Sequence, residues 1–226
     1  MKSQQAGFTL VEIAIVLVII GLLLGGILKG QELINSAKVK NLANDFRTIP
    51  TYIYGYQDKF RALPGDDPGV VNHVTGGTLA TTNGTPGNGV IEGAWNTATM
   101  TDESALFWQH VRLANLAAGP TVTTDPNYMP KNAEGGQMGL SSATGTLLQI
   151  TGMSGTYQIC SRGILGKFVK QLDTQIDDGE PCTGSLRAVA EGAALGATPV
   201  KGAGAPATCT GTLIDDATSY TVCMTF

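Results

Sequence analysis

The chain has 226 residues, of which 14% are charged, and its formal net charge at pH 7 is −4. This balance argues against a surface built to bind nucleic acid, because such surfaces use lysine and arginine to neutralise phosphates. With only His73 and His110, the sequence argues strongly against a histidine-based metal centre, and the sequence patterns of common catalytic centres are absent. We therefore expect a protein that is not an enzyme and that uses no metal or cofactor.

Most of the hydrophobic character lies in residues 8–28, which contain one charged residue, Glu12. At 1.5 Å of rise per residue, a helix of this length is about 30 Å long, which matches the hydrocarbon core of a bilayer. Lys2 lies in the short polar segment before it, and positive charge on that side favours a cytoplasmic N-terminus. We expect this segment to cross a membrane and the rest of the chain to lie outside the cytoplasm.

Three interpretations of the segment differ in how they treat Glu12. A secretory signal peptide has a shorter apolar stretch of roughly 7–15 residues, with its cleavage site after that stretch. A simple membrane anchor leaves the carboxylate in hydrocarbon, at a cost on the order of 2.5–3.5 kcal/mol. The third interpretation gives the carboxylate a partner.

The run Gly7-Phe8-Thr9-Leu10-Val11-Glu12 resembles the type III signal of type IV pilins and pseudopilins. The resemblance implies that a prepilin peptidase cuts between Gly7 and Phe8 and then methylates the amino group of Phe8. It also implies that Glu12 acts in assembly, by pairing with this amino group in its own or a neighbouring chain. Residues 1–7 would then be a leader peptide, and residues 8–28 a transmembrane and filament-core helix.

Glycine recurs in and just after the apolar segment, at Gly21, Gly25, Gly26 and Gly30. Small residues four apart allow close helix packing, and each interior glycine weakens a helix by about 1 kcal/mol relative to alanine. Filaments of the resembling family often contain a locally melted stretch near the position of Gly21. This chain has Lys29 where that family frequently has proline. The four glycines therefore indicate helix packing or flexibility, with ordinary membrane-helix glycine as the alternative.

Helical spacing of apolar residues predicts that the spine helix continues through residues 29–63, with an interruption at Pro50 and an end at Leu63-Pro64-Gly65. Residues 64–226 would form a globular pilin-like head. We expect an α+β fold, in which the long N-terminal helix packs on a head with an antiparallel sheet and additional short helices. A second helix should follow Thr101-Asp102, and a third should span residues 164–176. The expected strands are residues 146–150, 156–160, 186–190, 209–214 and 220–226.

The loop of residues 64–100 is rich in glycine, threonine, asparagine and proline. Its resemblance to a calcium loop is poor, because Gly84, Pro86 and Asn88 stand where acids are wanted. Whether this loop binds calcium stays open. Three pairs of adjacent acids are expected to be solvated turn caps: Asp66-Asp67, Asp177-Asp178 and Asp215-Asp216.

The four cysteines all lie between residues 160 and 223. An extracytoplasmic head lies in an oxidising compartment, so disulfides are expected. A hairpin that turns at residues 215–217 would place Cys209 opposite Cys223, within disulfide reach. We therefore expect the pairs Cys209–Cys223 and Cys160–Cys182.

The resemblance implies a structural subunit that polymerises into a type IV pilus-like filament. Its partners would be copies of itself, the prepilin peptidase, an inner-membrane platform protein and a cytoplasmic assembly ATPase. The chain would lie in the bacterial inner membrane before assembly, and then in an extracellular or periplasm-spanning filament. A minor pilin or a type II secretion pseudopilin is the alternative within the family. A membrane-anchored binding or enzymatic domain is the alternative of a different class.

Overall fold

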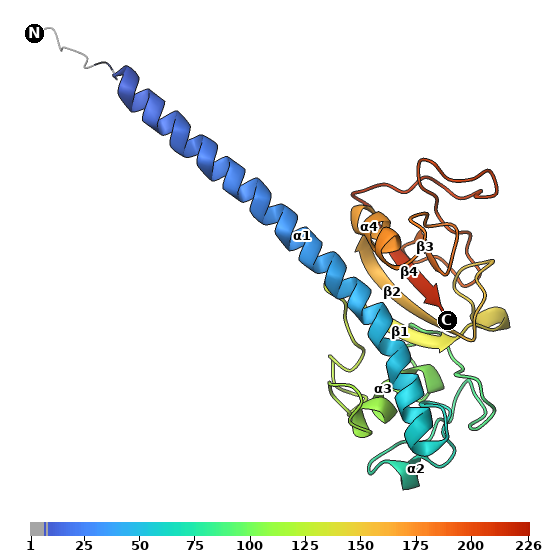
Figure 1. The fold of residues 1–226 in the computed structure, drawn as a ribbon. Coiled ribbons are helices and arrows are strands. Elements are labelled where there is room, and N and C mark those ends of the chain that lie inside the picture. Colours follow the sequence, from blue (N-terminus) through green and yellow to red (C-terminus); the bar gives the residue numbers. More distant parts are fainter. Residues whose placement is uncertain (1–6, 8) are drawn as a thin grey trace, which may run out of the picture. The chain divides into compact units, whose positions relative to one another are not determined.

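The computed structural model describes residue 7 and residues 9–226, and the chain divides into two compact units, residues 1–38 and 39–226. The elements are α1 (Leu10–Phe60), α2 (Val70–His73), α3 (Glu103–Leu113), β1 (Met138–Ser142), η1 (Gly145–Leu147), β2 (Tyr157–Leu165), α4 (Gly166–Ile176), β3 (Leu186–Ala190) and β4 (Ser219–Thr225) (Figure 1). Over the described residues, a long apolar helix is thus combined with a head of short helices and one four-stranded antiparallel sheet. The expected α+β class is confirmed.

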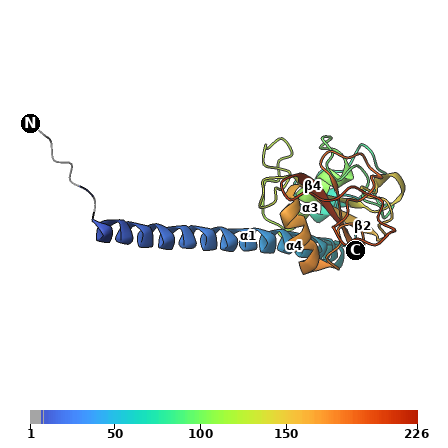
Figure 2. The same cartoon turned by 90° about the horizontal axis from the view of Figure 1, so that it is seen from above.

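Helix α1 runs without a break through Pro50. Proline has no amide hydrogen, so one helical hydrogen bond is missing there. Apolar residues three and four apart, before and after Pro50, form the buried face of α1 and keep both parts of the helix packed on the core. The residues of α1 buried in the second unit are Val39, Leu42, Ala43, Phe46, Ile49, Ile53 and Tyr56. Most of them join the main core, together with side chains of α3, α4 and the sheet. Figure 2 shows α4 lying alongside this part of α1.

The strand order is β1-β2-β4-β3, so β2 and β4 are the central strands. Successive residues of a strand point to opposite faces of its sheet. Ile159, Ala188 and Val222 belong to the main core, which includes residues of α1. Cys160, Val189 and Cys223 belong to a second, smaller core, which Trp95, Ile150 and Met153 cover. Both faces of the sheet are therefore buried.

The expected disulfide pairs are wrong, because the structure joins Cys160 to Cys223 and Cys182 to Cys209. Strand β4 already has β2 and β3 as its neighbours, so it cannot form a hairpin with the segment before residue 215. In the register of β2 with β4, Cys160 lies directly opposite Cys223, with their Cα atoms 4.1 Å apart. Cys209 is left to pair with Cys182.

Two of the five expected strands are also wrong. Residues 146–150 contain the end of η1 and one isolated bridge, and residues 209–214 contain only an isolated bridge at Leu213. Strand β1 was not expected, because its sequence MGLSS is poor in β-branched and aromatic residues. Close packing requires glycine at position 139 of this strand, because a Cβ there would collide with the backbone carbonyl of Trp95.

Two helices begin at or near the residues expected from the sequence. The third expected helix begins at Gly166 rather than at Ile164, because Ile164 and Leu165 are the last residues of β2. Helix α3 begins after Asp102, as expected, although this carboxylate does not cap the helix. It accepts hydrogen bonds from Thr82, Asn83 and Thr97 instead, so it holds the preceding loop against the helix.

Candidate functional site

The apolar helix begins at a reciprocal pair of hydrogen bonds between Thr9 and Glu12. Glu12 Oε2 accepts the backbone N–H of Thr9 at 2.8 Å and its hydroxyl at 2.7 Å, and the backbone N–H of Glu12 donates to Thr9 Oγ1 at 3.2 Å. This arrangement is a capping box, which satisfies amides that have no partner in the first helical turn. The spacing Thr-x-x-Glu is the sequence signal of such a box. Glu12 therefore has local donors, although neutral donors leave its charge uncompensated.

The proposed partner of Glu12 is the amino group created at Phe8, which lies outside the described residues. Gly7 is described and exposed, and no atom lies within 4 Å of a Cβ added to it. Within the part of the chain that the structure describes, nothing therefore requires glycine at position 7 for packing. If glycine is needed there, the requirement comes from an enzyme that handles the segment.

Residues 10–28 form an exposed, continuous apolar surface. Helix α1 contains a stretch long and apolar enough to cross a membrane, with a mean hydropathy of 2.8 and none of that stretch buried. Large side chains such as Leu10, Leu22 and Leu28 are 91%, 74% and 67% exposed. Removing such side chains from water is favourable by roughly 1.5–3 kcal/mol each, so the segment calls for a lipid or protein environment.

The four glycines in the N-terminal half of α1 make no close contact with the described residues of the chain. A Cβ added at Gly21, Gly25, Gly26 or Gly30 would meet no atom within 4 Å, and α1 is helical through all four positions. Their use in packing between helices or in local melting therefore stays a prediction about contacts with other molecules.

Residues 2–28 match the family model for the prokaryotic N-terminal methylation motif. The chain carries a type IV pilin-like prepilin signal. The signal supports a precursor of the pilin or pseudopilin type, and it implies processing by a prepilin peptidase and assembly into a pilus or pseudopilus. No curated protein and no solved structure gives a significant match to the chain. Beyond the prepilin signal, the head has to be interpreted from its own residues.

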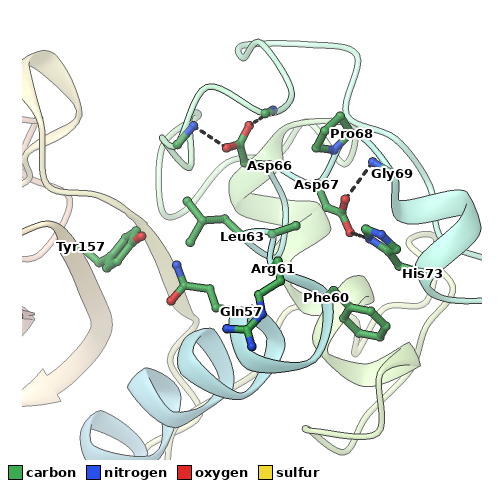
Figure 3. A pocket seen from close by; sticks show the side chains of 13 residues that line it. Gln57, Phe60, Arg61, Leu63, Asp66, Asp67, Pro68, Gly69, His73 and Tyr157 are labelled. Carbon is green, nitrogen blue, oxygen red and sulfur yellow. Dashed lines mark hydrogen bonds and ion pairs between the residues drawn. The ribbon is translucent and has the colours of Figure 1, made fainter.

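In the head, a cavity of about 640 Å³ lies where α1 ends, lined by residues that include Arg61, Asp66, Asp67 and His73 (Figure 3). The carboxylate of Asp66 accepts backbone N–H groups from Gly87, Asn88 and Gly89. These bonds hold the glycine-rich loop against the end of the spine helix.

Asp67 is the centre of a second network beside the same cavity. Its Oδ2 accepts the hydroxyl of Tyr56 at 2.7 Å and lies 2.6 Å from Nδ1 of His73, and its Oδ1 accepts the N–H of Gly69 at 2.8 Å. Asp66 and Asp67 are at most 2% exposed, so the expectation of a solvated acid pair is wrong here. The two acids join the helix end to its loop.

Another buried acid, Glu103, lies at the start of α3. Its Oε2 accepts the N–H of Glu92 at 2.9 Å, while its Oε1 is buried without a hydrogen-bond partner. Burial is the main reason that the pKa of Glu103 is raised to about 7, and the nearby acids Asp66, Glu92 and Asp102 raise it further. His110, later in α3, accepts the N–H of Gly65 and contacts the carbonyl of Thr78, so it also ties loops to this helix.

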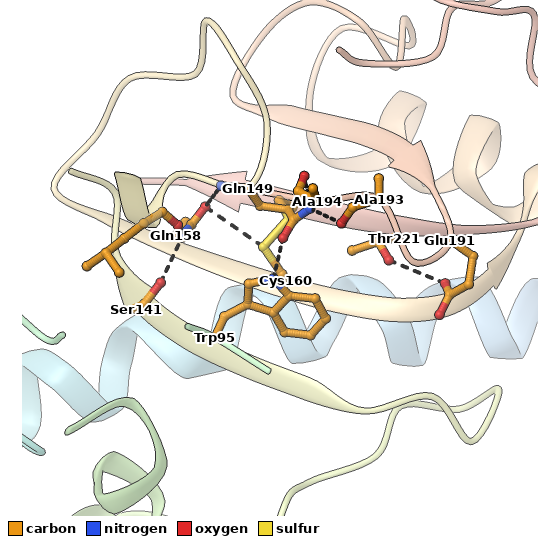
Figure 4. Close-up of a disulfide and its surroundings, with 11 residues drawn as sticks. Trp95, Ser141, Gln149, Gln158, Cys160, Glu191, Ala193, Ala194 and Thr221 are labelled. Atoms are coloured by element: carbon orange, nitrogen blue, oxygen red, sulfur yellow. Dashed lines mark hydrogen bonds between the residues drawn. A yellow bond between two sulfur atoms is a disulfide. The ribbon is translucent and has the colours of Figure 1, made fainter. Parts of the chain in front are cut away.

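The second face of the sheet holds a polar network around the Cys160–Cys223 disulfide (Figure 4). The indole N–H of Trp95 donates to Gln149 at 2.8 Å, and the Gln149 amide donates to the carbonyls of Ala193 and Ala194. Gln158 donates to Ser141 at 2.9 Å. Buried polar groups with such partners stabilise one arrangement of the loops over the sheet.

Proposed function

We propose that the chain is a prepilin that is cut between Gly7 and Phe8, methylated at Phe8 and polymerised into a type IV pilus-like filament. The observation that carries this proposal is the prepilin signal followed by the exposed apolar stretch of residues 10–28, in which Glu12 is the single acid. In this account, residues 1–7 are the leader, residues 8–28 form the membrane and filament-core helix, residues 29–63 continue the spine, and residues 64–226 form the head.

The role of Glu12 follows from charge. Cleavage frees an α-amino group at Phe8, and methylation to a secondary amine keeps its positive charge. In a bundle of such helices, this amine neutralises a Glu12 carboxylate that would otherwise be buried alone. Removing one partner of a buried ion pair costs roughly 3–5 kcal/mol. The pair therefore sets the position of an incoming subunit more than it adds stability to a single chain.

The partners proposed are further copies of the chain, the prepilin peptidase, an inner-membrane platform protein and a cytoplasmic assembly ATPase. Before assembly the chain lies in the bacterial inner membrane with its head outside the cytoplasm, and afterwards in an extracellular or periplasm-spanning filament. The head acts as a structural body and not as an enzyme. Both disulfides of the head suit an oxidising compartment.

A minor pilin and a type II secretion pseudopilin share the same processing and the same use of Glu12. They differ from a major subunit in abundance, so the composition of a purified surface filament separates them. A membrane-anchored binding or enzymatic domain is the proposal of a different class. It has no assembly role for Glu12, and the consequence of replacing that residue distinguishes it.

Processing is tested by the substitution Gly7→Leu, with Gly26→Leu as the matched control inside the helix. We expect the Gly7 variant to keep residues 1–7, because the peptidase must accept a small residue just before the cut. The control should be processed normally. Intact-mass measurement of the membrane-inserted protein gives the result directly, and a Gly7→Leu product that begins at Phe8 would refute the proposal.

A further inference from the structure

A small cavity of about 170 Å³ lies between α1, α3 and the loop that precedes β1. Helix α1 contributes Asp45 and Tyr52 to its lining, α3 contributes Trp108 and Arg112, and the loop contributes Lys131. Trp108 and Arg112 are buried, whereas Lys131 is exposed. The cavity therefore runs from the surface at Lys131 to a buried wall that carries polar groups.

Arg112 places a buried positive charge at this cavity. Its Nη1 donates hydrogen bonds to the backbone carbonyls of Pro120 at 2.8 Å and Tyr128 at 2.7 Å, but its Nε is buried and has no hydrogen-bond partner. Among the described residues, no carboxylate forms an ion pair with Arg112. Burial lowers the pKa of the guanidinium, because the charge is out of water and is bonded only to neutral oxygens.

Trp108 brings a second buried donor to the same cavity. The indole N–H of Trp108 has no hydrogen-bond partner, and the guanidinium carbon of Arg112 lies 5.6 Å from the centre of its ring. Residues four apart on a helix are neighbours, so α3 holds the two donors side by side. A buried donor without an acceptor is costly, and two such donors beside a positive charge call for a negatively charged oxygen ligand.

Gly119 keeps side-chain atoms away from the guanidinium. A Cβ added at Gly119 would lie 2.6 Å from Nε and 3.0 Å from Nη2 of Arg112, and the φ of Gly119 is 134°, which also favours glycine. The edge formed by Nε and Nη2 is the one that a carboxylate can accept from with both of its oxygens. Any other residue at position 119 would crowd this edge.

We propose that the cavity binds a small carboxylate such as acetate, with its oxygens accepting hydrogen bonds from Arg112 and Trp108. An engineered cavity of roughly 150 Å³ holds benzene, so a ligand of a few heavy atoms suits the volume of about 170 Å³. Lys131 adds positive charge at the mouth of the cavity and favours the entry of an anion.

Asp45 opposes such a ligand and limits its affinity. Its carboxyl group also lines the cavity, and burial raises its pKa to about 6. At pH 8 this group is therefore ionised and repels an anion. Removing its charge should strengthen binding, which is the opposite of the effect expected at Arg112.

The test follows the two indole N–H signals by nuclear magnetic resonance, on the full chain in detergent with isotopically labelled tryptophan. Sodium acetate replaces sodium chloride at constant ionic strength and pH 8. We expect a saturable downfield shift of the Trp108 signal, which Trp108→Phe identifies by removing it. The signal of Trp95 is the internal control, because this indole already donates to Gln149 and should not move.

Variants separate the site from general effects of charge. Arg112→Lys keeps the charge but loses the two-donor edge, so it should weaken acetate binding about tenfold or more. Asp45→Asn should bind acetate severalfold more tightly at pH 8. Arg162→Lys is the matched control, since Arg162 pairs with Glu191 away from this cavity, and it should bind as the wild type does.

Two results would overturn the proposal. One is a Trp108 signal that acetate does not move, or that moves together with the signal of Trp95. The other is acetate affinity in Arg112→Lys equal to that of the wild type. If a displaced Trp95 signal shows that Arg112→Lys is misfolded, Asp45→Asn decides instead, and unchanged affinity in that variant would reject the site.

Discussion

At the scale of single residues, Glu12 has two roles: it is a charge that needs a positive partner, and it caps the first turn of α1. The sequence alone identifies the first role. Its position in an apolar run marks it as a group that needs a positive partner, and that inference uses the sequence alone. The structure adds that Thr9 holds the carboxylate in a capping box. The capping box orients Glu12 at the start of the helix, so the carboxylate is already held in place for the amine that we propose as its partner.

Buried acids in the head show what sequence reasoning could not supply. Adjacent acids such as Asp66-Asp67 are ordinary turn residues in a sequence. In the fold, Asp66 is bound by backbone amides of a loop about 20 residues further on, and Asp67 is bound by Tyr56 and His73. The same holds for Glu103, which is bound by the amide of Glu92. These contacts are formed by loops without periodic patterns, and pattern-based prediction has no access to them.

Glu103 leads to a prediction about pH. Its pKa is about 7 in the folded head and about 4.3 in an unfolded chain, so folding favours the protonated form. This contribution to stability is full below about pH 4 and is lost as the pH rises through 7, with a total of up to roughly 3 kcal/mol. Glu103→Gln should therefore lose less stability than the wild type between pH 5 and pH 8.

Urea unfolding followed by tryptophan fluorescence, with the disulfides intact, measures this difference. The control is Glu32→Gln, since Glu32 forms an exposed ion pair with Lys29 and exposed pairs contribute little. That variant should follow the wild type at both pH values. Identical pH dependence in Glu103→Gln and the wild type would show that Glu103 does not titrate as described.

At the scale of elements, the helices were predictable because their apolar residues recur every three or four positions. Helix α1 and the body of α4 follow this pattern. Strands β2, β3 and β4 were predictable from a different signal, short runs that contain β-branched and aromatic residues. Strand β1 and the disulfide pairing were not predictable in this way. Both depend on which strands become neighbours, and sequence distance favoured a hairpin between residues 209–214 and β4 that the fold does not contain.

The disulfide pairing gives the prediction at this scale. A non-reducing peptide map of the exported protein should link Cys160 to Cys223 and Cys182 to Cys209, and alkylation should find no free thiol. Replacing Cys160 and Cys223 by serine should cost about 4 kcal/mol, because this bond closes a loop with a sequence separation of 63. A peptide linking Cys209 to Cys223 would contradict the register of β2 with β4.

At the scale of the whole molecule, the two units have different requirements. Residues 39–226 bury their apolar side chains in their own cores, whereas residues 10–28 expose theirs. The second unit can therefore be stable in water, while the first unit needs a membrane or neighbouring helices. This division matches a subunit that is held in a bilayer before assembly and in a filament core afterwards.

The central claim is that Glu12 serves assembly between chains, and Glu12→Val tests it most directly. The measurement is the amount of the protein in the sheared surface fraction relative to the membrane fraction, for the wild type and the variant. We predict that insertion and processing remain, since valine removes a charge that is costly in hydrocarbon, while the surface fraction falls at least tenfold because the amine of Phe8 loses its counter-charge. A normal yield of surface filaments from Glu12→Val would contradict the account.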